Sequence, residues 1–478
     1  MLLRICALLL AATTALLAQP ARRTVALVIT GGTVVTMDAA GRVLSPGAVA
    51  IDGRHIVAVD TPDAIGARFS ARETIDAAGQ VVMPGLVNTH THAPMVLYRG
   101  LADDLVLMDW LQKYIFPAEA KTVSREFVRA GTRLAALEMI QSGTTTYTDM
   151  YYFEEEIAAV TKAAGLRGVL GQTIIQFPVA DAKTPAEELA RTAAFLDQFA
   201  GDDLIVPAIA PHSMYTLDTA TLKSVRALAS RKHAPVIIHL SETRDEMTTS
   251  QAKHKATPAA YLESIGFWGP SAGSGHAPST GSGPAPRTVA AHGVWLTAGD
   301  MAILARHHVG VSHNPESNMK LASGAAKVVA MRHAGIAVGI GTDGAASNND
   351  LDMFEAMRQA AFLAKHSGRD PTAVPAQAAL DMATIGGARA LYMAQRIGSI
   401  EPGKRADLIT VSTSAARQTP MYDPVSHLVY VTRGDDVRTT IVDGKVLMKD
   451  RQVRTLNRAT VIADANRLAA RVREAVRP

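Results

Sequence analysis

The middle of the chain alternates between short apolar runs and longer amphipathic segments. The short runs are rich in Val, Ile and Thr, which favour strands, whereas the longer segments repeat apolar residues every three or four positions, as helices do. Strands are predicted over 80–88, 144–150, 167–173, 205–210, 235–240, 288–292, 309–313 and 337–342. Helices are predicted between them, for example over 126–141, 154–164, 186–199, 219–232 and 352–365.

Strands that alternate with helices over about 300 residues predict an α/β fold of the (β/α)8 TIM-barrel type. We assign the barrel to residues 83–399. A doubly wound sheet is the alternative, but no Gly-rich dinucleotide-binding loop follows the first strand. A Pro/Gly/Ser-rich stretch over 269–287 predicts a flexible surface loop between the fifth and sixth strands.

Both ends of the chain show a different pattern, in which short alternating strands are joined by tight turns. Asp52-Gly53 lies between two alternating apolar runs, which is a strong hairpin signal. Gly31-Gly32 predicts a break between two strands. Residues 22–82 together with 400–450 are therefore predicted to form a small composite β-sandwich, and 451–478 a closing amphipathic helix.

The length and composition of the chain are those of a globular enzyme. With 478 residues, 48% hydrophobic and 19% charged, the chain suits one large domain and a smaller one. The formal net charge is only +4, and the basic residues form no cluster. Binding to nucleic acid requires basic residues gathered on one face, so we expect no nucleic-acid partner.

The first 21 residues resemble a secretory signal peptide, because a short basic start precedes an apolar run. That run is shorter than the ~20 residues that span a bilayer. An uncleaved anchor is the alternative. Cleavage would yield a secreted or periplasmic protein without membrane association. It would also remove Cys6, the only cysteine, so any metal must be held by His, Asp or Glu.

Candidate metal ligands follow the predicted barrel strands. His90 and His92 are two positions apart, so an extended backbone directs both imidazoles to the same face. His239 ends the fifth strand, and Glu242 is close enough in sequence to act as a proton shuttle. In a barrel, the C-terminal ends of the strands carry the chemistry, so these side chains are predicted to meet.

Two further strands end in residues that fit the same site. Asp343 follows a buried, Gly-rich strand, where a carboxylate is costly unless it pairs with a cation. It is the predicted fourth ligand. His292 ends the sixth strand and is predicted either to bind the metal or to hydrogen-bond to the attacking water. The fourth strand ends in Pro211-His212 and offers no lysine that could bridge two metals.

These motifs resemble the amidohydrolase superfamily. The run MPGLVNTHTH over 83–92 is similar to its first metal motif. Several other segments resemble the methylthioadenosine/S-adenosylhomocysteine deaminase family, which is related to triazine hydrolases. They are 116–119, 211–213, 239–243, 312–318 and 341–349.

The resemblance implies one divalent metal, zinc or alternatively Fe²⁺, and a homo-oligomer. It implies that Glu242, His292 and Asp343 are catalytic, and the implied metal ligands are His90, His92, His239 and Asp343. Glu119 would accept hydrogen bonds from ribose hydroxyls, and His212 would contact the nucleoside. Gln172 stands where some members carry an arginine for the sugar or its substituent, and Trp110 would line the pocket.

The expected reaction is hydrolytic deamination of an aminated heterocycle to the oxo product and ammonia. The resemblance points to an adenosine derivative: methylthioadenosine, S-adenosylhomocysteine or adenosine. One alternative is a chlorohydrolase or a guanine- or pterin-type deaminase that uses the same site. A second alternative is a binding protein without catalytic activity.

Overall fold

The computed structural model describes residues 22–269 and 287–476. The predicted signal peptide, with Cys6, and nearly all of the predicted loop over 269–287 lie outside the described residues. Among the described residues, no helix is both long enough and apolar enough to cross a bilayer.

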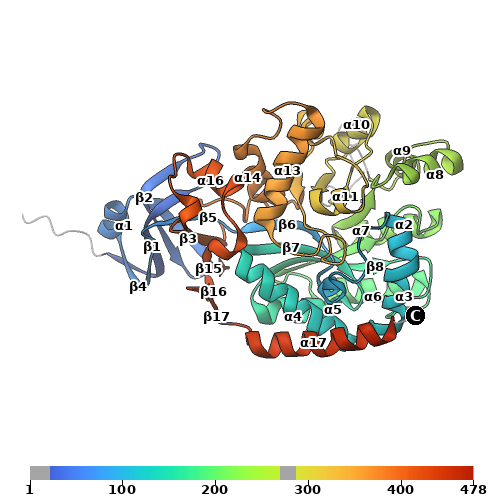
Figure 1. Cartoon of the computed structure of the whole chain (residues 1–478), viewed down its shortest axis with the longest axis horizontal. Helices are drawn as coiled ribbons and strands as arrows, with labels where there is room; N and C mark the ends of the chain where they lie inside the picture. The colour runs from blue at the N-terminus through green and yellow to red at the C-terminus, as the bar shows by residue number, and fades with distance from the viewer. Residues whose placement is uncertain (1–21, 270–286, 477–478) are drawn as a thin grey trace, which may run out of the picture.

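Eight parallel strands close into a barrel, in the order β10-β11-β12-β13-β6-β7-β8-β9 (Figure 1). The strands are β6 (Leu86–Thr91), β7 (Thr144–Tyr151), β8 (Arg167–Ile174), β9 (Ile205–Pro211), β10 (Val236–Leu240), β11 (Thr288–His292), β12 (Gly310–His313) and β13 (Val338–Ile340). All of the predicted barrel strands are present, and most bounds differ from the prediction by no more than two residues. The (β/α)8 barrel is confirmed.

Helices surround the barrel strands. They include α4 (Arg125–Ser142), α5 (Glu154–Ala164), α6 (Pro185–Gln198), α7 (Thr219–Lys232), α10 (Ala298–Arg306), α12 (Val328–His333), α13 (Met353–Gly368), α14 (Ala376–Ala383) and α15 (Ile385–Ala390). Their ends follow local chemistry. The Ser124 hydroxyl accepts a hydrogen bond from the Phe127 N–H and begins α4, and Gly143 ends that helix with a φ of 90°.

Shorter helices follow the strands at the opening of the barrel. They are η1 (Ala93–Tyr98), α2 (Leu107–Asp109), the π-helical η2 (Trp110–Ile115), α3 (Phe116–Thr122), α8 (Arg244–His254), α9 (Pro258–Ser264) and α11 (Pro315–Lys320). This face of the barrel is where (β/α)8 enzymes hold their active sites.

The two ends of the chain meet in a second sheet of nine strands. Its strands are β1 (Arg23–Val35), β2 (Val43–Asp52), β3 (His55–Asp60), β4 (Phe69–Asp76), β5 (Gln80–Pro84), β14 (Leu408–Ser412), β15 (Val437–Val442), β16 (Lys445–Lys449) and β17 (Gln452–Val453). Short helix α1 (Pro62–Arg68) packs on this sheet, whereas α16 (Pro424–Tyr430) packs against α13 and α14 of the barrel. The 3-10 turns are η3 (Ala416–Gln418) and η4 (Gly434–Asp436). The composite domain is confirmed: its strands are hydrogen-bonded in one path, and residues of its two ends, such as Ile51 and Leu408, pack in one core.

The predicted break at Gly31-Gly32 is wrong. Strand β1 runs through both glycines, and its pairing with β2 shifts register there. Gly31 has a φ of 87°, a conformation that glycine adopts without steric cost, so the chain forms a bulge instead of a turn.

The predicted strand over 80–88 is two strands that belong to different sheets. Strand β5 pairs with β14 of the small sheet, whereas β6 pairs with β7 of the barrel. Gly85 separates them, and a Cβ at this position would lie 2.1 Å from the Thr145 hydroxyl oxygen. Glycine is therefore required where β6 and β7 approach each other closely. This close approach directs β6 into the barrel.

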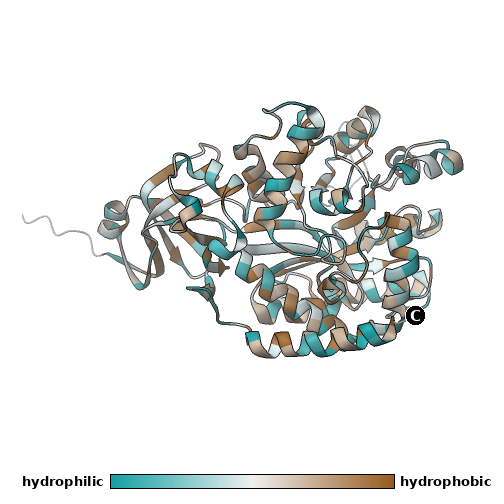
Figure 2. Cartoon of the chain, viewed as in Figure 1, coloured by the Kyte–Doolittle hydropathy of each residue, from teal (hydrophilic) through white to brown (hydrophobic). Residues whose placement is uncertain are grey.

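The closing helix, α17 (Arg458–Ala475), begins later than predicted because the last strand of the small sheet occupies part of 451–457. It packs along α4 on the outside of the barrel (Figure 1). Hydrophobic and hydrophilic residues alternate along α17 (Figure 2), which fits a helix with one buried face. Arg467 and Arg471 both pair with Glu126 of α4, at 2.8 and 2.9 Å.

Candidate active site

Five predicted site residues meet at the C-terminal ends of four barrel strands. His90 lies in β6 and His92 directly after it, while His239 lies in β10. His292 ends β11, and Asp343 follows β13. The Asp343 N–H donates to the His90 carbonyl at 3.0 Å, so the backbone itself joins the two ends of the ligand set.

The distances between these side chains fit a single metal ion. The Asp343 Oδ1 atom lies 3.3 Å from His92 Nε2 and 3.5 Å from His90 Nε2, and the Nε2 atoms of His92 and His239 are 3.4 Å apart. Ligands that bind zinc tetrahedrally at ~2.0–2.1 Å are about 3.3 Å from one another. The structure therefore brings His90, His92, His239 and Asp343 close enough together to hold one metal ion.

The environment of His90 also indicates a ligand. Its side chain is 0% exposed, and among the described residues neither ring nitrogen has a hydrogen-bond partner. A buried polar group without a partner is costly, and a metal ion would remove that cost. Burial lowers the pKa of His90 to about 4, so the ring is neutral and keeps a lone pair for binding.

Asp343 supplies the negative charge of the site. Burial alone would raise its pKa, but the neighbouring imidazoles of His90 and His92 hold the pKa well below the ordinary value. The carboxylate is therefore ionised, as a metal ligand must be. Asp343 adopts a φ of 65° and His292 a φ of 74°, conformations that residues other than glycine rarely adopt. Such backbone strain is frequent at functional sites.

Backbone carbonyls orient two of the ligating imidazoles. His92 Nδ1 lies 2.7 Å from the Met150 carbonyl, and His239 Nδ1 lies 2.8 Å from the His212 carbonyl. A carbonyl accepts a hydrogen bond, so each Nδ1 carries the proton and each Nε2 offers its lone pair to a metal.

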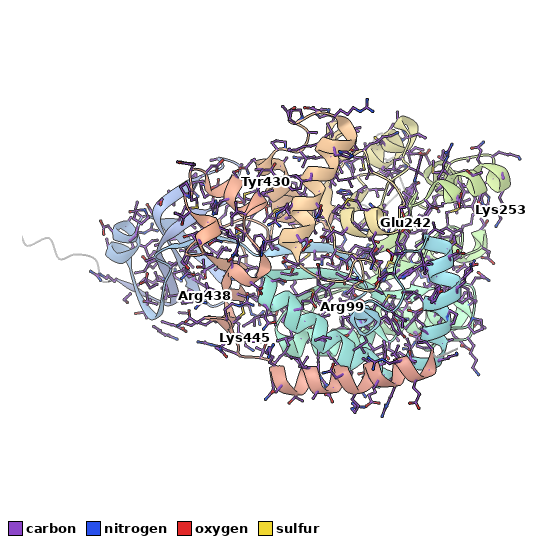
Figure 3. The ribbon with its side chains drawn as sticks, in the orientation of Figure 1. Arg99, Glu242, Lys253, Tyr430, Arg438 and Lys445 are labelled. Carbon is purple, nitrogen blue, oxygen red and sulfur yellow. The ribbon has the colours of Figure 1, made fainter. Side chains whose placement is uncertain are left out.

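Glu242 and His292 lie together beside the ligands. Glu242 Oε2 is 3.8 Å from His292 Nε2, and Figure 3 labels Glu242 in the barrel, away from the small sheet. Burial raises the pKa of Glu242, which suits a group that both takes and returns a proton. His292 Nδ1 lies 3.0 Å from Asn318 Oδ1, which fixes the ring.

A cavity opens onto these residues. Trp110, Glu119 and His212 line it, as predicted. The other lining residues are mostly apolar or aromatic: Met95, Leu107, Leu111, Ile115, Phe116, Met150, Tyr151, Tyr152, Thr173, Tyr215 and Leu321.

Glu119 of α3 is buried and accepts a 2.6 Å hydrogen bond from the Tyr151 hydroxyl. Burial raises its pKa to about 7, although the Tyr151 hydrogen bond opposes the shift. Tyr151 was not predicted as a site residue. Tyr151 is the last residue of β7, the barrel strand that pairs with β6, and this position was the available signal.

The structure does not bring Gln172 to the cavity. Its amide donates to Asp181 at 2.9 Å and accepts from the Glu154 N–H at 3.2 Å. Thr173, the next residue, lines the cavity instead. Adjacent residues of a strand face opposite sides, so Thr173 faces the cavity in place of Gln172, for which a substrate contact was predicted.

Known proteins show the same organisation. The model of the amidohydrolase family matches residues 81–447. A 5-methylthioadenosine/S-adenosylhomocysteine deaminase of Syntrophobacter fumaroxidans is 44% identical over 431 residues, which cover 90% of this chain and 94% of the relative. A 5'-deoxyadenosine deaminase of Methanosarcina barkeri is 43% identical over 445 residues, which cover 93% of this chain and 97% of the relative.

A solved structure agrees with these sequences. The crystal structure of an adenosine deaminase from Xanthomonas campestris with bound zinc has a TM-score of 0.89 and 40% identity, and the match covers 95% of this chain and 100% of that chain. The resemblance inferred from the motifs is confirmed. The chain therefore belongs to the amidohydrolase family, and it resembles deaminases of that family over nearly its whole length.

Proposed function

We propose that this protein is a zinc-dependent deaminase that converts an adenosine-type nucleoside to its 6-oxo product and ammonia. The observation that carries the proposal is that three histidines and one aspartate lie within ligand distance of one another, with Glu242 nearby, at a cavity. The relatives named as deaminases of methylthioadenosine, S-adenosylhomocysteine and 5'-deoxyadenosine support the choice of substrate.

The reaction requires one water molecule to replace an amino group. A divalent metal held by His90, His92, His239 and Asp343 would supply a Lewis acid that lowers the pKa of water to about 7. Glu242 takes a proton from the water and delivers it to the ring nitrogen next to the amino-bearing carbon. The water oxygen then forms its bond to that carbon, which has lost electron density to the protonated ring.

The remaining steps use the same residues. Glu242 and His292 are close enough to share the second water proton, which goes to the amino group. The carbon–nitrogen bond breaks and ammonia leaves, while the oxygen keeps the double bond. Asn318 holds the His292 ring in place throughout, because its amide oxygen occupies the opposite ring nitrogen.

The far part of the cavity suits the sugar. The Glu119 carboxylate accepts hydrogen bonds from ribose hydroxyls, and Tyr151 fixes its orientation. His212 lies at the side of the cavity with its ring 4.8 Å from that of His239, where it contacts the nucleoside base or sugar.

The test combines metal analysis with an ammonia-release assay. We expect about one zinc per chain, loss of activity after chelation, and recovery when zinc is restored. The substrate panel contains adenosine, 5'-deoxyadenosine, methylthioadenosine, guanine, a pterin and a chlorinated triazine, and turnover of the triazine is measured by chloride release. Turnover of only the last three would replace the proposal with one of the alternative hydrolases. Bound metal without turnover on any of them would favour a binding protein. Higher activity with Fe²⁺ than with zinc would assign Fe²⁺ in place of zinc as the working metal.

We also propose that the protein is exported and assembles into a homo-oligomer. The basic and apolar pattern of residues 1–21 supports export. Cell fractionation should find the protein outside the cytoplasm, and N-terminal sequencing should find a mature chain that begins near residue 22. An intact N-terminus would contradict cleavage. Sedimentation analysis would test assembly, and a monomer would contradict it.

A further inference from the structure

Carboxylates are the only anionic groups that line the cavity, and no lysine or arginine lines it among the described residues. The carboxylates are Glu119, Glu242 and Asp343. The segment 270–286, which the structure does not describe, contains no lysine or arginine in its sequence. Apart from the proposed metal site, the described lining therefore offers no lysine or arginine that could pair with a carboxylate or phosphate of a ligand.

The nearest cations along the sequence are committed elsewhere. Lys113 pairs with Asp109 at 2.9 Å, and its side chain is 64% exposed on the outer side of η2. Lys320 donates to Asn349 at 2.8 Å and also pairs with Asp103.

Two arginines on the other sides of the opening also contact partners outside the cavity lining. Arg244 is exposed and lies over the Trp295 ring, 5.9 Å from its centre. Arg191, beside the end of β8, pairs with Glu155 at 3.0 Å and with Asp181 at 3.4 Å.

The wall that carries Glu119 is apolar. Trp110 and Ile115 lie five positions apart, the spacing of the backbone hydrogen bonds in a π-helix, and both line the cavity. Leu111 and Phe116 repeat the same spacing, and Glu119 follows Ile115 by four positions, the repeat of an α-helix. The change of helix type therefore places apolar side chains and the ribose-binding carboxylate on one wall.

We propose that this cavity selects adenosine-type nucleosides whose 5′ substituent is uncharged, and that it rejects those whose 5′ substituent is anionic. The inference rests on the proposed function, in which Glu119 binds the ribose. The 5′ substituent is attached to that ribose and therefore lies along the wall formed by residues 107–119. A buried anion there would have no cation partner and would face Glu119, a like charge.

The sharpest test uses two adenosine derivatives that differ by one charge. Adenosine 5′-carboxamide and adenosine 5′-carboxylate have nearly the same shape. We expect kcat/KM for the carboxylate to be at least about 100-fold lower, the size of effect that an unpaired buried charge produces.

A variant pair locates the effect. Leu111→Arg should raise the carboxylate-to-carboxamide ratio of kcat/KM by about tenfold or more, because it adds a cation partner. Leu111→Gln is equally polar without the charge and should leave the ratio unchanged. A thermal unfolding midpoint near that of the wild type checks that each variant folds.

The outcomes separate the two proposals. Similar kcat/KM for the carboxylate and the carboxamide would overturn the selectivity and leave the deaminase assignment intact. The same ratio in Leu111→Arg as in the wild type would overturn the placement of the 5′ substituent on this wall. Ammonia from none of the adenosine derivatives would overturn the proposed function, and the selectivity with it.

Discussion

Glu242 lies 3.8 Å from His292 and outside the set of metal ligands, so its role in proton transfer can be separated from metal binding. We expect Glu242→Gln to retain zinc and to lose about 10²–10⁴-fold in kcat, the contribution of general acid–base catalysis. The measurements are zinc content and ammonia release. Asp245→Asn changes an exposed acid three residues away and should keep the wild-type rate. A Glu242→Gln variant with the wild-type kcat would exclude Glu242 from the mechanism.

Glu119 should make substrate binding depend on pH. Burial raises its pKa to about 7, so below that pH the group is protonated and loses the carboxylate that accepts ribose hydroxyls. We expect KM to rise about tenfold as the pH falls from about 8 to about 6, with a smaller change in kcat. Glu119→Gln should bind more weakly at all these pH values, and its KM should be flat. A steep pH dependence of KM in that variant would assign the titration to another group.

The clustering of the candidate metal ligands could be predicted from the sequence because each follows from a local strand pattern. His90 and His239 belong to apolar strands, and the end of a barrel strand always faces the same opening. Tyr151 and Asn318 act through partners that are distant in sequence, namely Glu119 and His292. Those pairs exist only after the chain has folded, so the strand pattern could not reveal them.

The junction between β5 and β6 is controlled by one glycine. Gly85→Ala would place a Cβ within 2.1 Å of the Thr145 side chain at the point where the chain passes from one sheet to the other. We expect the free energy of unfolding to fall by about 1–3 kcal/mol, as overpacking of a core does, and thermal or urea unfolding would measure it.

Gly66 of α1 is the matched control for that substitution. Nothing lies within 4 Å of the Cβ that Gly66→Ala would add. Alanine exceeds glycine in helix propensity by up to about 1 kcal/mol, so this variant should be as stable as the wild type or more stable. Equal effects of the two substitutions would show that the contact with Thr145 does not constrain the junction.

The barrel was predicted closely because its strands are buried on both faces and read as continuous apolar runs. The small sheet was predicted less well. A strand pattern does not say which strands share a sheet, so 80–88 was taken as one strand although Gly85 divides it. The pattern also does not reveal that β5 links the N- and C-terminal strands, because it pairs on one side with β14 and on the other with β1.

A buried arginine joins the barrel to the small sheet. Arg167 begins β8, its side chain is 1% exposed, and it contacts Asp407 at 2.9 Å and Asp443 at 3.2 Å. Arg167→Met would leave two carboxylates without this partner, so we expect a loss of about 3–5 kcal/mol in the free energy of unfolding. The exposed pair of Arg23 and Asp52 is the control, and Arg23→Met should cost less than about 1 kcal/mol.

Unfolding by denaturant would measure the free energy of unfolding of both variants, Arg167→Met and Arg23→Met. A double variant, Arg167→Met with Asp407→Asn, should recover part of the lost stability, because it removes a buried charge together with its partner. Equal losses for Arg167→Met and Arg23→Met would mean that the buried contact does not hold the two parts of the molecule together.

The pairing of Pro84 with Leu408 also sets an order of events during synthesis. A ribosome makes β1 to β5 first and must then complete the entire barrel before β14 can emerge. Until then the early strands keep an open hydrogen-bonding edge, the kind of edge along which chains associate wrongly. A chain truncated before β14 would thus leave this edge of β5 without its partner.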